Sequence, residues 1–287
     1  MKKIKVLALC AIAAGFVISC QKNDTIEEVQ PETSTEISKE DQIALAKAGV
    51  NPLAATYQTL THPDGTTVKG IMGGSEGFQD IFIALDDLAN QALPSSPDNV
   101  KQYRTNNLVR RNSTIDVIGY TGSGFALTQR MRTGLQWAVN NYNRINTSLT
   151  FRLTFTASTN GDMVIYNAGG SGAGGSAEFP SGGNPGKFIR ILGGMASQNN
   201  NVNEHVIGHE MGHALGFRHT DYARRRCDGS NEGTAGSIGA INIPGTPTAN
   251  RWGQNGLDSG SLMISCFDGS EDGEFSRFDI IALEELY

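Results

Sequence analysis

Three histidines in this chain are spaced so that they can share one metal ion. Residues 204–221 read EHVIGHEMGHALGFRHTD. His209 and His213 are four residues apart, so on a helix both imidazoles lie on one face, one turn apart. Gly216 allows the sharp exit from that helix that would return His219 as a third ligand. Three protein nitrogens leave the fourth position of a tetrahedral zinc ion open to water, which indicates a catalytic rather than a structural site.

The carboxylate next to the first of these histidines completes the chemistry. Zinc lowers the pKa of its water toward about 7, and Glu210 can then take the proton as general base. The full pattern HExxHxxGxxH fixes six positions and arises by chance in about one chain in 10⁵. His205 lies one turn before His209, and we expect it to pack in the helix or to support the ligands without binding the metal.

Elements that could carry this motif follow from hydrophobic periodicity. Apolar residues at three- and four-residue steps predict a long amphipathic helix over 127–145. The segments that alternate as strands are 114–120, 149–156, 163–166 and 188–192. A strand, a long helix and three further strands predict an α/β layer packed on a helix. The glycine-rich stretch 169–175 lacks a Gly-Lys-Ser/Thr ending, so we interpret it as a flexible loop near the cleft rather than a phosphate-binding loop.

Residues 37–112 form an N-terminal region distinct from the segment that follows. Ser38, with acidic residues after it and Gly49 at the far end, predicts a short helix. The stretch 81–85 predicts a strand, and His62 stands in a turn where we expect it to be exposed to solvent. Two readings of the region remain open, a structural extension and a propeptide that blocks an active site.

The first 20 residues predict an export signal. Three lysines precede an apolar run that is too short for a stable transmembrane helix, and the run ends Val17-Ile18-Ser19-Cys20. This ending resembles the lipobox of bacterial lipoproteins, so residues 1–19 would be removed and Cys20 lipidated; the alternative is an ordinary secretory signal. Residues 20–36 are polar and acidic, which predicts a disordered tether. Gln21-Lys22-Asn23-Asp24 is similar to tags that send lipoproteins to the outer surface, so we expect an outer-membrane lipoprotein at the cell surface.

Charge and cysteine content narrow the possible partners. The chain has 23 basic and 29 acidic residues, and loss of residues 1–19 leaves the mature protein near −9, a charge that disfavours nucleic-acid binding. The 35 glycines indicate loop-rich structure. Besides Cys10 and Cys20 only Cys227 and Cys266 remain, and in an exported protein they predict one disulfide, with two buried free thiols as the alternative.

The zinc motif resembles that of the metzincin metallopeptidases, whose extended pattern is HExxHxxGxxH. A methionine in a tight turn below the zinc is a second feature of that clan, and Met263, 44 residues after His219, fits it. Ser265 stands where several metzincins have a zinc-binding tyrosine. The closing segment 275–287 looks like the clan's C-terminal helix. Within the clan, HEMGHALGFRHTD together with KQYRTNNL at 101–108 resembles the bacterial dual-action protease metallopeptidase group, over about residues 37–287.

The resemblance implies a fold and an activity. The fold would be an α/β (α+β) metzincin-type catalytic domain over 113–287, with a twisted, mostly parallel sheet, two long helices and a loop-rich C-terminal subdomain. The activity would be that of a monomeric zinc endopeptidase with protein or peptide substrates. The substrate would lie extended along the edge strand of the sheet, supplied by 188–192 or the residues just before. The alternative is a surface adhesin that holds zinc without cleaving, against which the intact Glu210 argues.

Two further features of the sequence leave alternatives open. Residues 268–279 match several positions of an EF-hand loop, with Asp279 instead of Glu at position 12, so a calcium site is one interpretation. Some metzincins are kept inactive by a propeptide Cys or Asp on the zinc. No cysteine lies between residues 21 and 226, and the acidic candidates in the N-terminal region are Asp64, Asp80, Asp86 and Asp87.

Overall fold

The structure is a computed structural model, which describes residues 36–75, 78–93, 103–223, 240–266 and 272–287. Residues 34–287 belong to one compact unit. Four α-helices are described: α1 (Lys39–Lys47), α2 (Gln129–Arg144), α3 (Asn200–Leu215) and α4 (Arg277–Leu286). Two short 3-10 helices, η1 (Leu88–Gln91) and η2 (Gly193–Ser197), also occur. Among the described residues no helix is both long enough and apolar enough to cross a bilayer.

Eight strands form one sheet in the order β1-β2-β3-β8-β9-β7-β5-β6. Their bounds are β1 (Thr56–Thr61), β2 (Thr67–Ser75), β3 (Phe78–Ala84), β5 (Thr114–Tyr120), β6 (Thr150–Thr156), β7 (Met163–Gly169), β8 (Gly175–Glu178) and β9 (Phe188–Leu192). The pairs β5–β6, β5–β7, β7–β9 and β3–β8 are parallel, whereas the hairpin pairs and β8–β9 are antiparallel. A second, two-stranded sheet pairs β4 (Tyr103–Arg104) with β10 (Ile241–Asn242).

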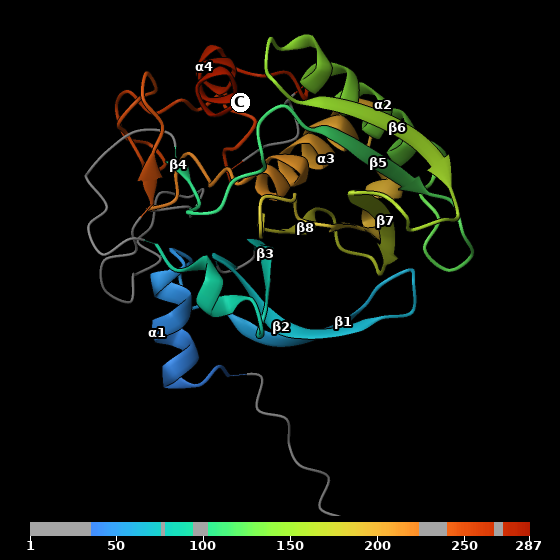
Figure 1. The fold of residues 1–287 in the computed structure, drawn as a ribbon, viewed down its shortest axis with the longest axis horizontal. Helices are drawn as coiled ribbons and strands as arrows, with labels where there is room; N and C mark the ends of the chain where they lie inside the picture. Colours follow the sequence, from blue (N-terminus) through green and yellow to red (C-terminus); the bar gives the residue numbers. More distant parts are fainter. Residues whose placement is uncertain (1–35, 76–77, 94–102, 224–239, 267–271) are drawn as a thin grey trace, which may run out of the picture. The chain divides into compact units, whose positions relative to one another are not determined.

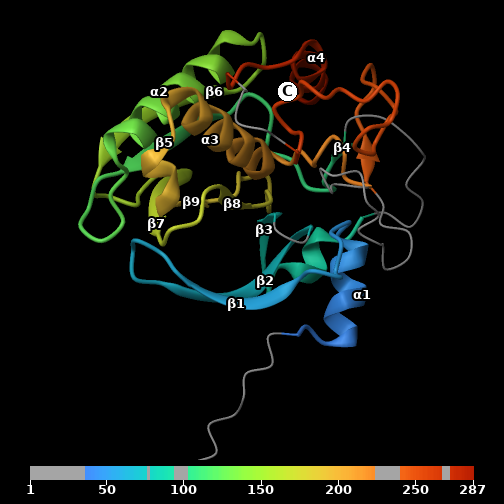
Figure 2. The same cartoon turned by 180° about the vertical axis from the view of Figure 1, so that it is seen from behind.

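The main core lies between strands β5 to β9 and helices α2 and α3, which run side by side in both views (Figures 1 and 2). The amphipathic stripe of α2 supplies Met131, Leu135 and Tyr142 to this core. Where the two helices cross, Gly134 lies so close to α3 that an added Cβ would stand 2.7 Å from the backbone of Asn203. The predicted helix, strands and layer are therefore confirmed, as is the mostly parallel α/β sheet.

The N-terminal region joins the same sheet rather than forming a separate layer. Its strand β3 pairs with β8 in parallel, with Ile81 opposite Ala177 and Phe82 opposite Glu178. A second hydrophobic cluster, including Leu45, Val50, Ile71 and Ile81, closes over Phe179, which follows β8. The helix predicted after Ser38 is present, and the Ser38 side chain accepts a hydrogen bond from the Asp41 backbone N–H.

Two expectations were wrong. His62 is buried, because the end of the β1–β2 hairpin folds onto β9: its ring stacks on Phe188 at 4.0 Å between centroids, and its Nδ1 lies 3.2 Å from the Tyr166 hydroxyl. Residues 188–192 are not an edge strand, because β9 lies between β7 and β8. The strand that borders the N-terminal region is β8, in the residues just before, at the end of the stretch that we expected to be a loop.

Candidate metal centre

Helix α3 places His209 and His213 in the interior of the molecule. The side chain of Asn199 caps its start, and every residue from Val202 to Leu215 is buried. The helix ends at Gly216, whose φ of +104° lies in the left-handed region that glycine adopts without a Cβ penalty. The turn brings His219, also fully buried, back under the helix as the spacing predicts.

The three imidazoles converge on one point. The Nε2 atom of His219 lies 3.2 Å from Nε2 of His209 and 3.1 Å from Nε2 of His213. Nitrogens bound to one tetrahedral zinc at 2.0–2.1 Å would stand about 3.3–3.4 Å apart, close to these separations. Nδ1 of His209 is 2.8 Å from the Leu262 carbonyl, and Nδ1 of His213 is 2.8 Å from the Phe217 carbonyl.

These carbonyls fix the protonation of two of the rings. A carbonyl only accepts, so Nδ1 of His209 and of His213 must carry the proton, and each Nε2 is left with a bare lone pair. Both lone pairs face Nε2 of His219, and a cation shared by the three nitrogens would stabilise this buried arrangement. The three residues therefore fit a zinc ion.

A fourth potential ligand comes from the N-terminal region. Asp80 of β3 lies with its Oδ2 atom 2.7 Å from Nε2 of His219 and 3.8 Å from Nε2 of His209. Asp80, His209, His213 and His219 offer four buried ligand atoms within 4.8 Å of one another. Burial alone would raise the pKa of Asp80, but the neighbouring histidines, His219 first, hold it well below its usual range. Of the four acidic candidates in the N-terminal region, Asp80 is the one that the structure brings to the histidines.

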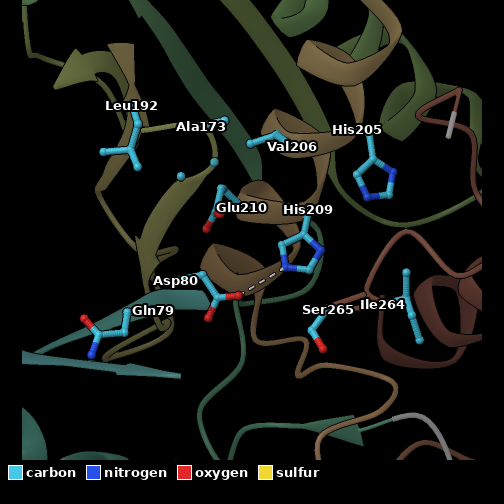
Figure 3. A pocket seen from close by; sticks show the side chains of 12 residues that line it. Gln79, Asp80, Ala173, Leu192, His205, Val206, His209, Glu210, Ile264 and Ser265 are labelled. Atoms are coloured by element: carbon cyan, nitrogen blue, oxygen red, sulfur yellow. Dashed lines mark ion pairs between the residues drawn. The ribbon is translucent and has the colours of Figure 1, made fainter. Parts of the chain in front are cut away.

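Glu210 lies beside this cluster, in the pocket drawn in Figure 3, where its side chain and those of Asp80 and His209 face the same space. It is buried, and no described residue donates a hydrogen bond to its Oε2 atom. Burial, and then the charge of Asp80, raise the pKa of Glu210 well above its ordinary value. Strand β8 passes directly over it: a Cβ added to Gly175 would stand 2.7 Å from Cγ of Glu210.

The rest of the pocket is largely apolar. Leu192, Val206 and Ile264 line it, together with His205 (Figure 3). His205 is not in the four-residue cluster, in agreement with the expectation that it does not bind the metal. Burial, and then the neighbouring His209, lower the pKa of His205 to about 3.

Met263 lies below the helix, as its distance from the motif predicts. A Cβ added to Gly212 would stand 2.3 Å from the Met263 sulfur, so helix and turn are in close contact. The carbonyl of Met263 accepts a hydrogen bond from the Thr220 backbone N–H at 2.9 Å, which ties the turn to the residue after His219. Ser265 does not substitute for the missing tyrosine, because its hydroxyl and its backbone N–H both donate to Asp221.

Two residues of the site escaped sequence reasoning, and several predictions fall elsewhere. Asp221 carries no motif signal of its own, and Asp279 entered the sequence analysis only as a calcium-loop residue, so it is their contacts with the turn 261–265 that reveal them. Cys266 is disulfide-bonded, whereas Cys227, the partner we predict, lies outside the described residues. Cys20 and the first four residues of the calcium-loop candidate, 268–271, also lie outside them. The position-12 carboxylate of that loop, Asp279, is buried and accepts hydrogen bonds from the chain instead.

Comparison with known proteins gives one informative match. A family model described as a dual-action HEIGH metallo-peptidase matches residues 78–287, and the HEIGH of that description stands in this chain as HEMGH, residues 209–213. No curated protein matches the chain. Two solved structures of myroilysin are similar at 16% identity and a TM-score of 0.36; the first covers 60% of this chain and 78% of its own, the second 61% and 83%. At that TM-score the likeness carries no weight for function.

Proposed function

Because this chain belongs to the dual-action HEIGH metallo-peptidase family, we propose that it is a zinc endopeptidase in which His209, His213 and His219 hold the metal. Family membership makes the chain a metal-dependent peptidase, so its substrate is a protein or a peptide. The observation that carries the zinc site is the convergence of three buried Nε2 atoms, two of which the Leu262 and Phe217 carbonyls leave as lone pairs.

Zinc bound there would supply Lewis acidity to the scissile carbonyl and to a water molecule. Glu210 is the general base: it takes the proton of the attacking water and delivers it to the leaving amine. Its unpaired Oε2 atom and its place beside His209 support this role. Gly175 leaves the room that the Glu210 side chain occupies.

The described form is a latent one, in our proposal, with Asp80 on the metal. Strand β3 runs along β8, the strand that borders Glu210, and it places Asp80 against the histidines. A substrate that docked along β8 would need the space that β3 occupies. The chain continues on both sides of Asp80, so the same groove admits a polypeptide that extends in both directions, which supports an endopeptidase rather than an exopeptidase.

Location and assembly remain proposals from the sequence. Residues 1–19 would be a lipoprotein signal, Cys20 the lipid-bearing residue, and residues 20–36 the tether that presents a monomeric enzyme at the outer surface. Mass spectrometry of the membrane fraction tests this proposal. A Cys20→Ser variant should lose the lipid mass and leave the membrane, and a lipid-free wild-type protein would contradict it.

The test of the function uses residues 21–287 as wild type, as Asp80→Ala, and as Asp80→Ala combined with Glu210→Ala, each with zinc content measured. Asp80→Ala should cleave a quenched peptide library at least about tenfold faster than wild type. Adding Glu210→Ala should lower the rate by about 10²–10⁴ with zinc retained, since a general base contributes that much.

The outcomes separate the claims. Equal rates for wild type and Asp80→Ala would reject latency and keep the enzyme. No cleavage by any variant with zinc bound would reject the endopeptidase in favour of a binding module. N-terminal sequencing of the same samples reports whether residues 37–112 are removed.

A further inference from the structure

The turn that contains Met263 is held from below by a carboxylate that the reaction itself does not use. Asp279 lies in the first turn of α4 and is buried. Its Oδ1 atom accepts the Ser261 hydroxyl at 2.6 Å. Its Oδ2 atom accepts the Leu262 backbone N–H at 2.7 Å and the Ser276 backbone N–H at 2.9 Å. One side chain thus joins the helix to two consecutive residues of the turn.

From this turn two short connections lead to the metal ligands. Leu262 makes a hydrogen bond through each of its backbone groups. Its N–H donates to Asp279, and its carbonyl accepts the Nδ1 proton of His209 at 2.8 Å. The hydroxyl of Ser261 lies 2.8 Å from that of Thr220, the residue after His219. The same Ser261 oxygen also accepts the Met263 N–H at 3.0 Å. The Leu262 backbone is therefore held by Asp279 at its N–H and contacts His209 through its carbonyl.

We propose that Asp279 is a positioning residue for the metal centre: it holds the Leu262 carbonyl against Nδ1 of His209 and so fixes the ring with its Nε2 lone pair toward the metal. Partners of this kind orient a ligand ring and set its tautomer, and their loss typically costs 10–100-fold in metal affinity. The inference rests on the proposed zinc site. It adds a residue that determines the orientation of His209, and this residue lies on α4, 17 positions beyond Leu262, whereas His209 lies on α3.

The donor count explains why the residue is an aspartate. Three donors converge on its two oxygens, and two of them are backbone N–H groups on the same oxygen. An asparagine amide group in either orientation would turn an NH₂ toward a donor. Burial raises the pKa of Asp279 to about 6, so the carboxylate is ionised at neutral pH despite its surroundings.

The competing explanation is that Asp279 only caps its own helix. It completes a capping box with Ser276, whose side chain accepts the Phe278 and Asp279 backbone N–H groups. Ser276 provides a matched control, because its side chain caps the same helix end without contacting the turn 261–265. Ser276→Ala should lower stability by about 1 kcal/mol through loss of the cap and of the Ser276 hydrogen bond to Asp258. It leaves the bonds from Ser261 and Leu262 to Asp279 in place.

The experiment measures zinc affinity, by competition with a chromophoric chelator, and the visible absorption spectrum of the Co²⁺-loaded protein. Both use residues 21–287 well below the melting temperature. Asp279→Asn should bind zinc 10–100-fold more weakly and show altered Co²⁺ bands, whereas Ser276→Ala should match wild type in both. Equal zinc affinity of Asp279→Asn and wild type, or equal losses in Asp279→Asn and Ser276→Ala, would overturn the proposal.

A second variant covers the case in which Asp279→Asn does not fold. Ser261→Ala removes one donor to Asp279 and the acceptor of the Met263 N–H but leaves no buried charge in a new place. It should weaken zinc binding several-fold, and wild-type affinity would count against the role of the turn. A wild type that binds neither zinc nor Co²⁺ would defeat the proposed function itself, an outcome distinct from failure of the Asp279 claim.

Discussion

The metal centre has a floor and a cover that are held by different forces. The floor consists of α3, the turn 261–265 and α4; the cover consists of residues 37–91, with β3 at the centre. In the floor, buried carboxylates bind backbone N–H groups, as Asp279 and Asp221 do at the two ends of the turn. The cover pairs with β8 through two residue pairs, and among the described residues it contributes one side chain, Asp80, to the cluster of metal-ligand atoms.

Additional contacts of the cover combine an apolar cluster with a few buried hydrogen bonds, such as that of the Gln91 amide to the Pro180 carbonyl. Phe179 inserts into the cover's hydrophobic cluster, and the Arg218 guanidinium donates to the Gly49 carbonyl while lying over the Phe179 ring. Buried charge-assisted hydrogen bonds are directional and costly to break, and the cover has one in the bond from Arg218 to Gly49. The apolar cluster around Phe179, by contrast, can open as a unit. We infer that ligand geometry is built into the floor, whereas release of the cover is part of the proposed latency and is tested by Asp80→Ala.

The largest effect should come from replacing one of the metal ligands in the floor. His213→Gln removes one of three converging nitrogens, so zinc affinity should fall by more than about 100-fold, beyond the loss expected for an outer partner. Chelator competition measures this change. His205→Gln, two turns earlier on α3 and outside the cluster, is the control that should leave zinc affinity near wild type.

Destabilising the hydrophobic cluster of the cover should have the next largest effect, and the loss of stability should be confined to the cover. Leu45 is fully buried in the cover's cluster, so Leu45→Ala should destabilise the cover by about 2–5 kcal/mol. Amide hydrogen exchange should accelerate in β3 but not in α3. Ile43→Ala, on the same helix with 58% of the side chain exposed, is the control expected to change neither. Equal acceleration in α3 would show that floor and cover unfold together and would remove the contrast.

Overpacking the floor should be somewhat milder. Gly212→Ala would force a methyl to 2.3 Å from the Met263 sulfur, which should cost about 1–3 kcal/mol and disturb the turn. Gly208→Ala is a matched control on the same helix, because its nearest neighbour would be a Leu262 side-chain atom at 3.3 Å. Urea denaturation should show a lower midpoint for the first variant and little change for the second.

The smallest effect at neutral pH should come from His62, at the contact between cover and sheet, and this effect should grow as the pH falls. Burial lowers the pKa of His62 to about 4 from 6.5, so the unfolded chain binds a proton there that the folded chain does not. Stability is therefore complete above pH 6.5 and falls as the pH drops toward 4. Relative to wild type, His62→Phe should gain at most about 3 kcal/mol between pH 7 and pH 4, measured by denaturation at both values. A constant difference would contradict the assignment.

Sequence reasoning predicted the floor far better than the cover, for physical reasons. The ligands, Gly216 and Met263 are tied to local geometry: a helical repeat, a left-handed exit and a turn. For the acidic residue at the metal, the sequence left four candidates, of which Asp80 is one. The pairing of residues 81 and 177, which places Asp80, is non-local and leaves no spacing signal. His62 was misjudged for the same reason, since its partner Phe188 is 126 positions away.

Strand β8 has a consequence for the behaviour of the enzyme in a test tube. Its hydrogen-bonding groups are satisfied by β9 on one side and by β3 on the other. If the cover departs, a row of backbone donors and acceptors is left bare, and such edges recruit strands from other chains. The protein without its cover should therefore self-associate more readily than the full chain at high concentration. A peptide bound along β8 should reduce this self-association. Preparations are best concentrated before activation, and light scattering before and after release of the cover would register the change.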